Sequence, residues 1–234
     1  MIKIVISGYG KMGKEIFSIL EKRDDVSLFT TDEICRFDKK TASEYICIDF
    51  TSPEAFRNNY RFIADNFKAA VVGTTGWNDI REEVTDYFGK RGKTLIYASN
   101  FSVGVNVFFE MARISSALLS SLGEYDSYIT ELHHKSKLDS PSGTAVTLKE
   151  IVENETGKEI SVHSVRCGHI TGIHNLGFES ADDRFLLSHE ANSRRGFAHG
   201  AVKAALWTLE RKGVFDFRAL LKEKFQNILN DERD

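Results

Sequence analysis

The chain has 234 residues, of which 41% are hydrophobic and 28% charged, as expected for a soluble protein with one large domain or two small ones. Its net charge of −3 at pH 7 offers no electrostatic basis for binding nucleic acid. The three cysteines, Cys35, Cys47 and Cys167, lack the spacing of a disulfide framework or a thiolate metal site, and their odd number suits a reducing cytoplasm.

The apolar run at residues 2–7 is too short for a signal peptide or a membrane span and instead predicts a buried strand. Residues 14–21 have helical periodicity. Between them lies a G-x-G-x-x-G loop, made of Gly8, Tyr9, Gly10, Lys11, Met12 and Gly13. Glycines at these positions permit a tight turn and let the backbone approach a pyrophosphate at the helix N-terminus. This order predicts a dinucleotide site, with an ordinary tight turn as the alternative.

The next predicted strand, residues 26–30, leads to an acidic turn. A carboxylate about twenty residues after the glycines is expected to bind the ribose hydroxyls of NAD, and Asp32 lies at about this distance from Gly13. Glu33 is an alternative ligand, and a solvated acidic turn is the alternative interpretation. Three basic residues that would tolerate a 2′-phosphate follow: Arg36, Lys39 and Lys40. The cofactor predicted here is therefore NADH or NADPH.

Three further predicted strands each end in a polar loop: residues 45–50, 69–72 and 94–98. Ser52 ahead of Pro53 predicts the start of a helix after the first of them. Strands that alternate with helices indicate a mostly parallel sheet, whose ligands bind at the carboxyl ends of the strands.

The densest group of titratable side chains lies in a predicted strand-to-helix loop, between a strand at 127–132 and a helix at 145–152. Ser142, Gly143 and Thr144 stand where this helix begins, so their backbone N–H groups favour a carboxylate or phosphate. His133, His134 and Lys137 precede them. The histidines would supply an acid or base that titrates near neutral pH, and the lysine would supply a fixed positive charge. The plain alternatives are a polar strand edge, a solvated lysine and a simple helix cap. No metal site is expected, because adjacent histidines on a strand point to opposite faces.

The rest of the chain is strand-rich. A helix is predicted at 105–122, strands at 160–166, 172–179 and 184–192, and a final helix at 197–212 that packs on the first domain. The predicted fold class is α/β, with a Rossmann-like parallel-sheet domain (residues 1–104 and 200–234) and a smaller α+β domain with an open mixed sheet (residues 105–199). Arg166 with residues 168–172 is a candidate for the substrate pocket. Structural or surface roles are expected for most of the other histidines: His163, His169, His174, His189 and His199.

Several motifs resemble those of one family. The run His133-His134-x-x-Lys137-x-Asp139-x-Pro141-Ser142-Gly143-Thr144-Ala145 resembles the signature of the dihydrodipicolinate reductase family, whose members are also called 4-hydroxy-tetrahydrodipicolinate reductases. Asp-Phe-Thr at 49–51, Gly-Thr-Thr-Gly at 73–76 and Asn-Phe-Ser-Val-Gly-Val-Asn at 100–106 resemble further landmarks. Two regions are shorter than is usual in that family: residues 30–45 and the loop before Gly172.

The resemblance implies reduction of 4-hydroxy-tetrahydrodipicolinate to tetrahydrodipicolinate, in the diaminopimelate route to lysine, with hydride from NADH or NADPH. It implies a homotetramer assembled through the second sheet. It implies cofactor contacts from two loops: Gly73, Thr74, Thr75, Ala98, Ser99, Asn100 and Phe101. It also implies a small cyclic dicarboxylate held by His134, Lys137, Ser142, Gly143 and Thr144.

His133 is the first choice as proton donor and Lys137 is the other candidate. Two rival functions remain: another NAD(P)-dependent dehydrogenase of small anions, and a dinucleotide-binding sensor without catalysis. Neither rival requires the acid–base loop beside a helix N-terminus.

Overall fold

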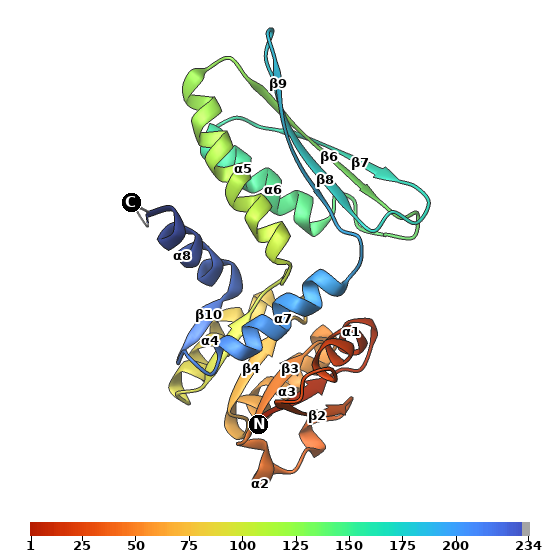
Figure 1. The fold of residues 1–234 in the computed structure, drawn as a ribbon, viewed down its shortest axis with the longest axis vertical. Helices are drawn as coiled ribbons and strands as arrows, with labels where there is room; N and C mark the ends of the chain where they lie inside the picture. The colour runs from red at the N-terminus through yellow and green to blue at the C-terminus, as the bar shows by residue number, and fades with distance from the viewer. Residues whose placement is uncertain (231–234) are drawn as a thin grey trace. The chain divides into compact units, whose positions relative to one another are not determined.

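The computed structural model describes residues 1–230, which form two compact units (Figure 1). The first comprises Met1–Val103 together with the chain from Arg194 onward, and the second comprises Gly104–Ser193. The boundary after Val103 lies one residue before the expected one, and the return at Arg194 comes before the expected residue 200. The early return arises because the helix α7 (Arg195–Trp207) begins at Arg195 and buries Ala198 in the core of the first unit.

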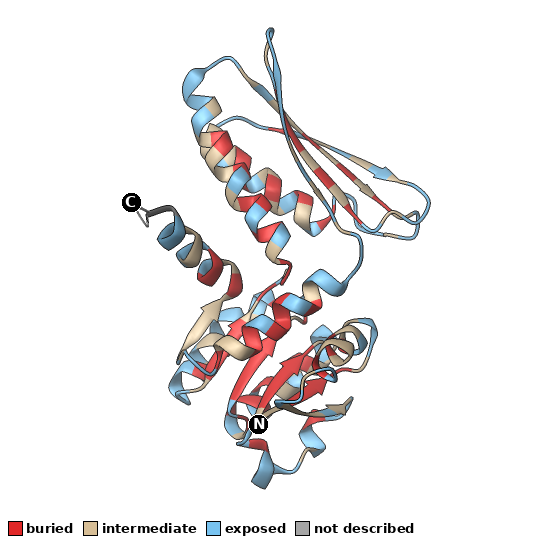
Figure 2. Ribbon diagram, in the orientation of Figure 1, coloured by how far each residue is buried: buried red, intermediate tan, exposed pale blue. Residues whose placement is uncertain are grey.

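The first unit contains a parallel sheet of the doubly wound type. Its strands run in the order β10-β5-β4-β3-β1-β2, and the paired strands are parallel. They are β1 (Ile2–Ser7), β2 (Val26–Thr31), β3 (Tyr45–Asp49), β4 (Ala69–Val72), β5 (Thr94–Tyr97) and β10 (Val214–Asp216). The central strands are buried on both faces, which explains their nearly continuous apolar sequences (Figure 2).

Helices cover both faces of this sheet. They are α1 (Lys11–Leu20), α2 (Lys39–Ala42), α3 (Pro53–Asn66), α4 (Arg81–Lys90), α7 (Arg195–Trp207) and α8 (Phe217–Asn230), with short 3₁₀ turns at Ile34–Arg36 and Asn78–Ile80. Alternation along β1 sends Ile4 and Ile6 into a core shared with α1, α7 and α8, and sends Val5 into a core shared with α3 and α4. The predicted start of α3 is present: the Ser52 side chain accepts a hydrogen bond from the Ala55 backbone and Pro53 is the first helical residue.

The second unit has a four-stranded mixed sheet in the order β7-β6-β8-β9. Strands β6 and β7 are parallel, whereas β8 is antiparallel to both of its neighbours, β6 and β9. The elements are α5 (Val103–Leu122), β6 (Asp126–His133), α6 (Gly143–Thr156), β7 (Ser161–Arg166), β8 (Ile173–Glu179) and β9 (Arg184–Glu190). Both helices pack on one face of the sheet, around Ile129, Leu176 and Phe178 (Figure 1).

The predicted fold class is confirmed, with local differences. The helix expected at 197–212 ends at Trp207. Strand β10 and helix α8 were not predicted. Strand β10 has only three residues, all of them half-buried, so its sequence has no alternation to detect. Among the described residues, no helix is long and apolar enough to cross a membrane.

Candidate active site

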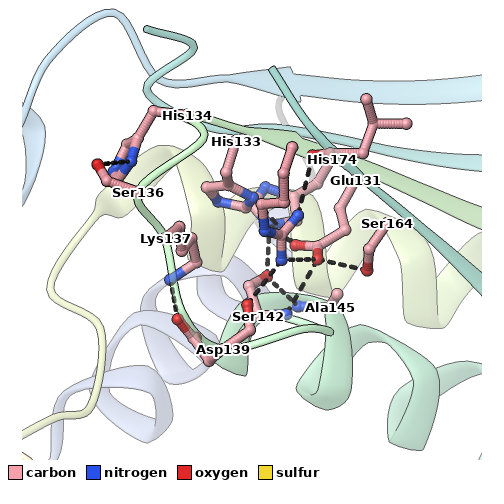
Figure 3. Close-up of polar contacts among 12 residues, drawn as sticks. Glu131, His133, His134, Ser136, Lys137, Asp139, Ser142, Ala145, Ser164 and His174 are labelled. Atoms are coloured by element: carbon pink, nitrogen blue, oxygen red, sulfur yellow. Dashed lines mark hydrogen bonds and ion pairs between the residues drawn. The ribbon is translucent and has the colours of Figure 1, made fainter. Parts of the chain in front are cut away.

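The candidate active site of the second unit lies at the end of β6, where the chain turns towards α6 (Figure 3). Glu131 and His133 are two residues apart on a strand, so both point to the face covered by the helices. The register of the sheet places Ser164 and His174 beside Glu131, and Arg166 beside His133. Glu131 and three residues that are distant in the sequence, Ser164, Arg166 and His174, therefore surround the predicted proton donor.

Glu131 is the centre of this group. It is fully buried, and its Oε1 atom accepts hydrogen bonds from Ser142 N (3.1 Å), Ser164 Oγ (2.6 Å) and Arg166 Nη2 (2.6 Å). Burial alone would raise the pKa of this carboxyl group, but the three hydrogen bonds outweigh it and hold the pKa at about 2. Glu131 is therefore ionised at neutral pH.

His133 is 6% exposed, and its Nδ1 atom lies 3.1 Å from Glu131 Oε2. Neither atom has a hydrogen-bond partner within the described chain. Burial lowers the pKa of His133, and the Glu131 charge opposes this effect only in part. On the other side of the ring, a Cβ atom at position 172 would lie 3.0 Å from Nε2, so a glycine there keeps this nitrogen uncrowded.

His174 was expected to be structural, and it instead belongs to this group. Its Nε2 atom is 3.1 Å from Ser142 Oγ, and its ring packs edge-on against His133 with 5.1 Å between ring centroids. Burial, and then the neighbouring His133, lower the pKa of His174 to about 4. Both histidines are therefore neutral in the free protein at neutral pH.

Glu131, His133 and His174 also present ligand atoms within 4.8 Å of one another. Three such ligands would fit a transition-metal ion by number and type. However, the guanidinium of Arg166 already contacts the same carboxylate, and a second cation there would be repelled. We therefore interpret this group as a hydrogen-bonded acid–base cluster.

Lys137 and His134 lie on the loop that follows β6. Lys137 Nζ forms an ion pair with Asp139 Oδ1 at 2.8 Å, and Arg166 Nη2 donates to the Asp139 carbonyl oxygen at 2.7 Å, which ties the loop to β7. His134 points away from His133 and pairs with Ser136 Oγ at 2.9 Å (Figure 3). The opposite orientation of the two histidines follows the strand alternation, and a substrate role for His134 stays a prediction.

The predicted helix start is present at the end of this loop. Ser142 is the N-cap of α6, and its side chain accepts a hydrogen bond from the Ala145 backbone at 3.2 Å. Gly143 is the first helical residue and Thr144 the second. The capping role is therefore clear, and the anion-binding role of this helix end stays a prediction.

The glycine loop in the first unit has the tight turn and the close helix-to-strand approach for which its glycines were predicted, and its contact with a dinucleotide stays a prediction. Gly8 has a φ of +91°, which favours glycine. A Cβ atom on Gly13 would collide with the carbonyl oxygen of Gly8, so the helix can approach the strand only with glycine there. The Tyr9 backbone donates a hydrogen bond to Asp32 Oδ1 at 2.8 Å, which fixes the acidic turn after β2 beside the loop.

A buried carboxylate connects the neighbouring loops. Asp49, at the end of β3, accepts hydrogen bonds from Ser7 Oγ (2.8 Å), Thr74 Oγ1 (2.6 Å) and Thr51 Oγ1 (2.9 Å). Thr74 also accepts a hydrogen bond from the Thr51 backbone. The hydroxyl of Thr74, which was predicted to contact the cofactor, is thus engaged in holding the ends of three strands.

The other predicted cofactor residues differ in exposure. Thr75 and Ser99 are exposed and Asn100 is half-buried. Ala98 and Phe101 are buried in the core, where the Phe101 ring packs against Phe217 at 4.9 Å between centroids. A Cβ atom on Gly73 would collide with the ring of Phe50. Thr75 and Ser99 are therefore the members of this set most exposed to a ligand.

The doubly wound sheet with its glycine loop, together with the buried acid–base cluster, defines an NAD(P)H-dependent oxidoreductase. Two family models match the chain: the dihydrodipicolinate reductase N-terminal model over residues 28–101, and the C-terminal model over residues 104–221. The chain belongs to the dihydrodipicolinate reductase family, as the sequence motifs predicted.

Similar proteins agree with this assignment. A 4-hydroxy-tetrahydrodipicolinate reductase of Christiangramia forsetii is 36% identical over 97% of this chain and 100% of its own length. One from Methanoculleus marisnigri is 34% identical over 91% of this chain and 95% of its own. Among solved structures, the dipicolinate-bound dihydrodipicolinate reductase of Paenisporosarcina sp. TG-14 has a TM-score of 0.75 at 22% identity, covering 92% of this chain and 97% of that one, and so shares the fold.

Proposed function

We propose that this chain reduces 4-hydroxy-tetrahydrodipicolinate to tetrahydrodipicolinate, with loss of water, in the diaminopimelate route to lysine. Membership of the reductase family across nearly the whole chain is the observation that carries this proposal. A bound nicotinamide cofactor would supply the hydride. The first unit would hold the cofactor through the glycine loop, and the second would hold the substrate.

The N-terminus of α6 is the proposed seat of a substrate carboxylate. The backbone N–H groups of Gly143 and Thr144 open a helix of 14 residues, whose dipole favours an anion. Lys137, with a side chain 24% exposed, adds a positive charge from the loop before it. A carboxylate held by both would be oriented as well as bound.

His133 is the proposed proton donor. Its lowered pKa leaves it neutral in the free protein, so it must gain a proton when the substrate binds. Two negative charges brought by a dicarboxylate favour that protonation, because opposite charges nearby stabilise the imidazolium. Nε2 faces away from Glu131 and is the atom from which the proton would leave.

Turnover is tested with substrate made in place, by condensing pyruvate with aspartate semialdehyde through a separate synthase, while the absorbance of the reduced nicotinamide is followed. Oxidation that depends on the condensation product supports the proposal. Cofactor binding without oxidation would instead favour another small-anion substrate or the sensor function.

NADH is the cofactor that the acidic turn favours. Asp32 is fixed at the glycine loop, and Glu33 next to it forms an ion pair with Arg36 at 2.7 Å. The Asp32 carboxylate repels a 2′-phosphate, whereas a ribose diol can donate to it. Arg36 is already paired and exposed, so it offers little compensation.

We expect kcat/KM for NADH to exceed that for NADPH, and Asp32→Ala to lower the NADH value by about tenfold, which is about 1.4 kcal/mol. Asp24→Ala is the matched control, because Asp24 is an exposed carboxylate in the turn before β2, at the other end of that strand from Asp32. Equal values for the two cofactors in the unmodified protein would contradict the preference.

A homotetramer assembled through the second sheet remains our proposal for the assembly. The face of this sheet opposite α5 and α6 exposes Val165 (46%) on one edge strand and Leu186 (49%) on the other, apolar side chains that a second copy would cover. Sedimentation of the purified protein tests it, and a monomer would exclude it. The cytoplasm is the proposed location, which the three free cysteines support.

A further inference from the structure

We propose that Glu131 is a positioning residue, whose one carboxylate holds both the His133 ring and the N-terminus of α6. It would thereby keep the proton donor at a fixed distance and orientation from the anion site. This inference rests on the proposed function, in which His133 donates the proton.

The hydrogen bonds of Glu131 are divided unequally between its two oxygens. Oε1 takes all three donors, from Ser142, Ser164 and Arg166. Oε2 has no hydrogen-bond partner within the described chain, and it lies 3.1 Å from His133 Nδ1. Three donors on one oxygen prevent the carboxylate from rotating, so the other oxygen stays aimed at the histidine.

The side of the ring that Glu131 contacts determines which nitrogen can act. A carboxylate next to Nδ1 favours the tautomer that carries hydrogen there. Nε2 then faces the position of Gly172, where no side chain crowds it. When His133 gains its second proton, Nδ1–H donates to Glu131 and Nε2–H is left for the substrate. Such hydrogen bonds are often poorly aligned in the free enzyme and tighten in the complex.

The same carboxylate reaches the helix. The Ser142 backbone donates to Glu131 Oε1 at 3.1 Å, and Ser142 is the N-cap of α6. The Ser142 hydroxyl in turn contacts His174, whose ring packs against His133. A shift of Glu131 would therefore move the donor and the helix end relative to each other.

The charges around His133 come from every element that packs against it. They are Glu131 on β6, Arg166 on β7, the titratable His174 on β8, and Lys137 and Asp139 in the loop after β6. Lys137 and Arg166 disfavour the imidazolium, while Glu131 and Asp139 favour it. Glu131 is the only one of these within a direct contact distance of the ring nitrogen among the described ion pairs.

Glu131→Gln tests the inference, because it keeps the shape and removes the charge. We expect kcat to fall by at least about tenfold, with the dissociation constant of NADH unchanged. The limb of the pH profile on which activity is lost as pH rises should move to lower pH, because Glu131 no longer favours the protonated ring. A purely structural role would lower activity equally at all pH values.

Glu153→Gln is the matched control. Glu153 also accepts a backbone hydrogen bond in the second unit, from Ile160 at 3.1 Å, but it belongs to the last turn of α6, at the opposite end of the helix from Ser142. Its substitution should leave the pH profile in place. An unmoved limb in Glu131→Gln, with turnover equal to that of the control, would overturn the inference.

Two measurements on the unmodified protein do not depend on the variant folding. Nitrogen NMR should show His133 with its hydrogen on Nδ1, and a ring with hydrogen on Nε2 would refute the positioning role. Turnover should survive dialysis against EDTA, whereas loss that zinc restores would assign Glu131 to a metal instead. The NMR result holds even if the substrate proposed above proves wrong, so the two failures are distinguishable.

Discussion

His133→Ala and Lys137→Ala are each expected to lower turnover of 4-hydroxy-tetrahydrodipicolinate by on the order of 10²-fold or more. The first variant removes the buried imidazole that faces Gly172, and the second removes the cation on the loop before α6. Cofactor binding should be nearly unchanged in both, because the glycine loop and Asp32 belong to the other unit. Steady-state kinetics and NADH titration measure the two effects separately.

The two variants should differ in KM. Lys137→Ala removes a charge that would contact the substrate in its ground state, so its KM should rise together with the fall in kcat. His133→Ala removes a group needed for proton transfer, so kcat should carry most of its loss. His163→Ala and Lys135→Ala, both at exposed positions of the same unit, are the controls. Turnover that is unchanged in both test variants would remove the proposed mechanism.

Acid should destabilise the second unit in two stages. The pKa of His174 is about 4 in the folded protein, below the ordinary histidine value of 6.5, so the unfolded chain binds its proton first as pH falls. Stability is therefore lost between pH 6.5 and about 4, and the difference in pKa corresponds to roughly 3 kcal/mol. Glu131 continues the loss from 4.5 down to about 2, by a similar amount, as its ionic hydrogen bonds are given up.

Chemical denaturation at a series of pH values measures this dependence. His174→Gln should flatten the first stage, because the group that takes up a proton on unfolding is gone. His163→Gln, at an exposed position on β7, should leave it in place. Asp49 in the first unit works in the opposite direction, because burial raises its pKa, so the variants are compared by differences. Identical pH dependence in His174→Gln and the unmodified protein would contradict the assignment.

Much of the fold was predictable because its signals are local. The run Ile2–Ser7 before the glycines predicted β1 without help from distant residues, and Ser52 with Pro53 predicted the start of α3. Strand β10 has no such signal. Its three residues become a strand only because they pair with β5, at Leu95, Ile96 and Tyr97, more than a hundred positions earlier. Local pattern does not encode that pairing.

The site shows the same division. His133, Lys137 and Ser142 were predicted because they stand within one loop. Glu131 could also have been predicted to lie beside His133, since residues two apart on a strand share a face. The roles of Ser164, Arg166 and His174 depend on the register of β7 and β8 against β6. The alternation of a strand indicates the face of the sheet to which a side chain points, but it does not indicate which residue of the neighbouring strand lies beside it.

The interrupted course of the first unit bears on how it is synthesised. Ile4 and Ile6 on β1 need Ala201 and Leu220 as core partners, and the whole of Gly104–Ser193 is translated between these two groups. A ribosome-bound chain that has not yet exposed α7 carries one apolar face of the parallel sheet uncovered. The second unit, continuous in sequence, has all of its strands available earlier. The nucleotide-binding unit of this enzyme is therefore the last to be completed. Until α7 is synthesised, the exposed apolar face of its sheet is the part of the nascent chain most prone to aggregate and to need a chaperone.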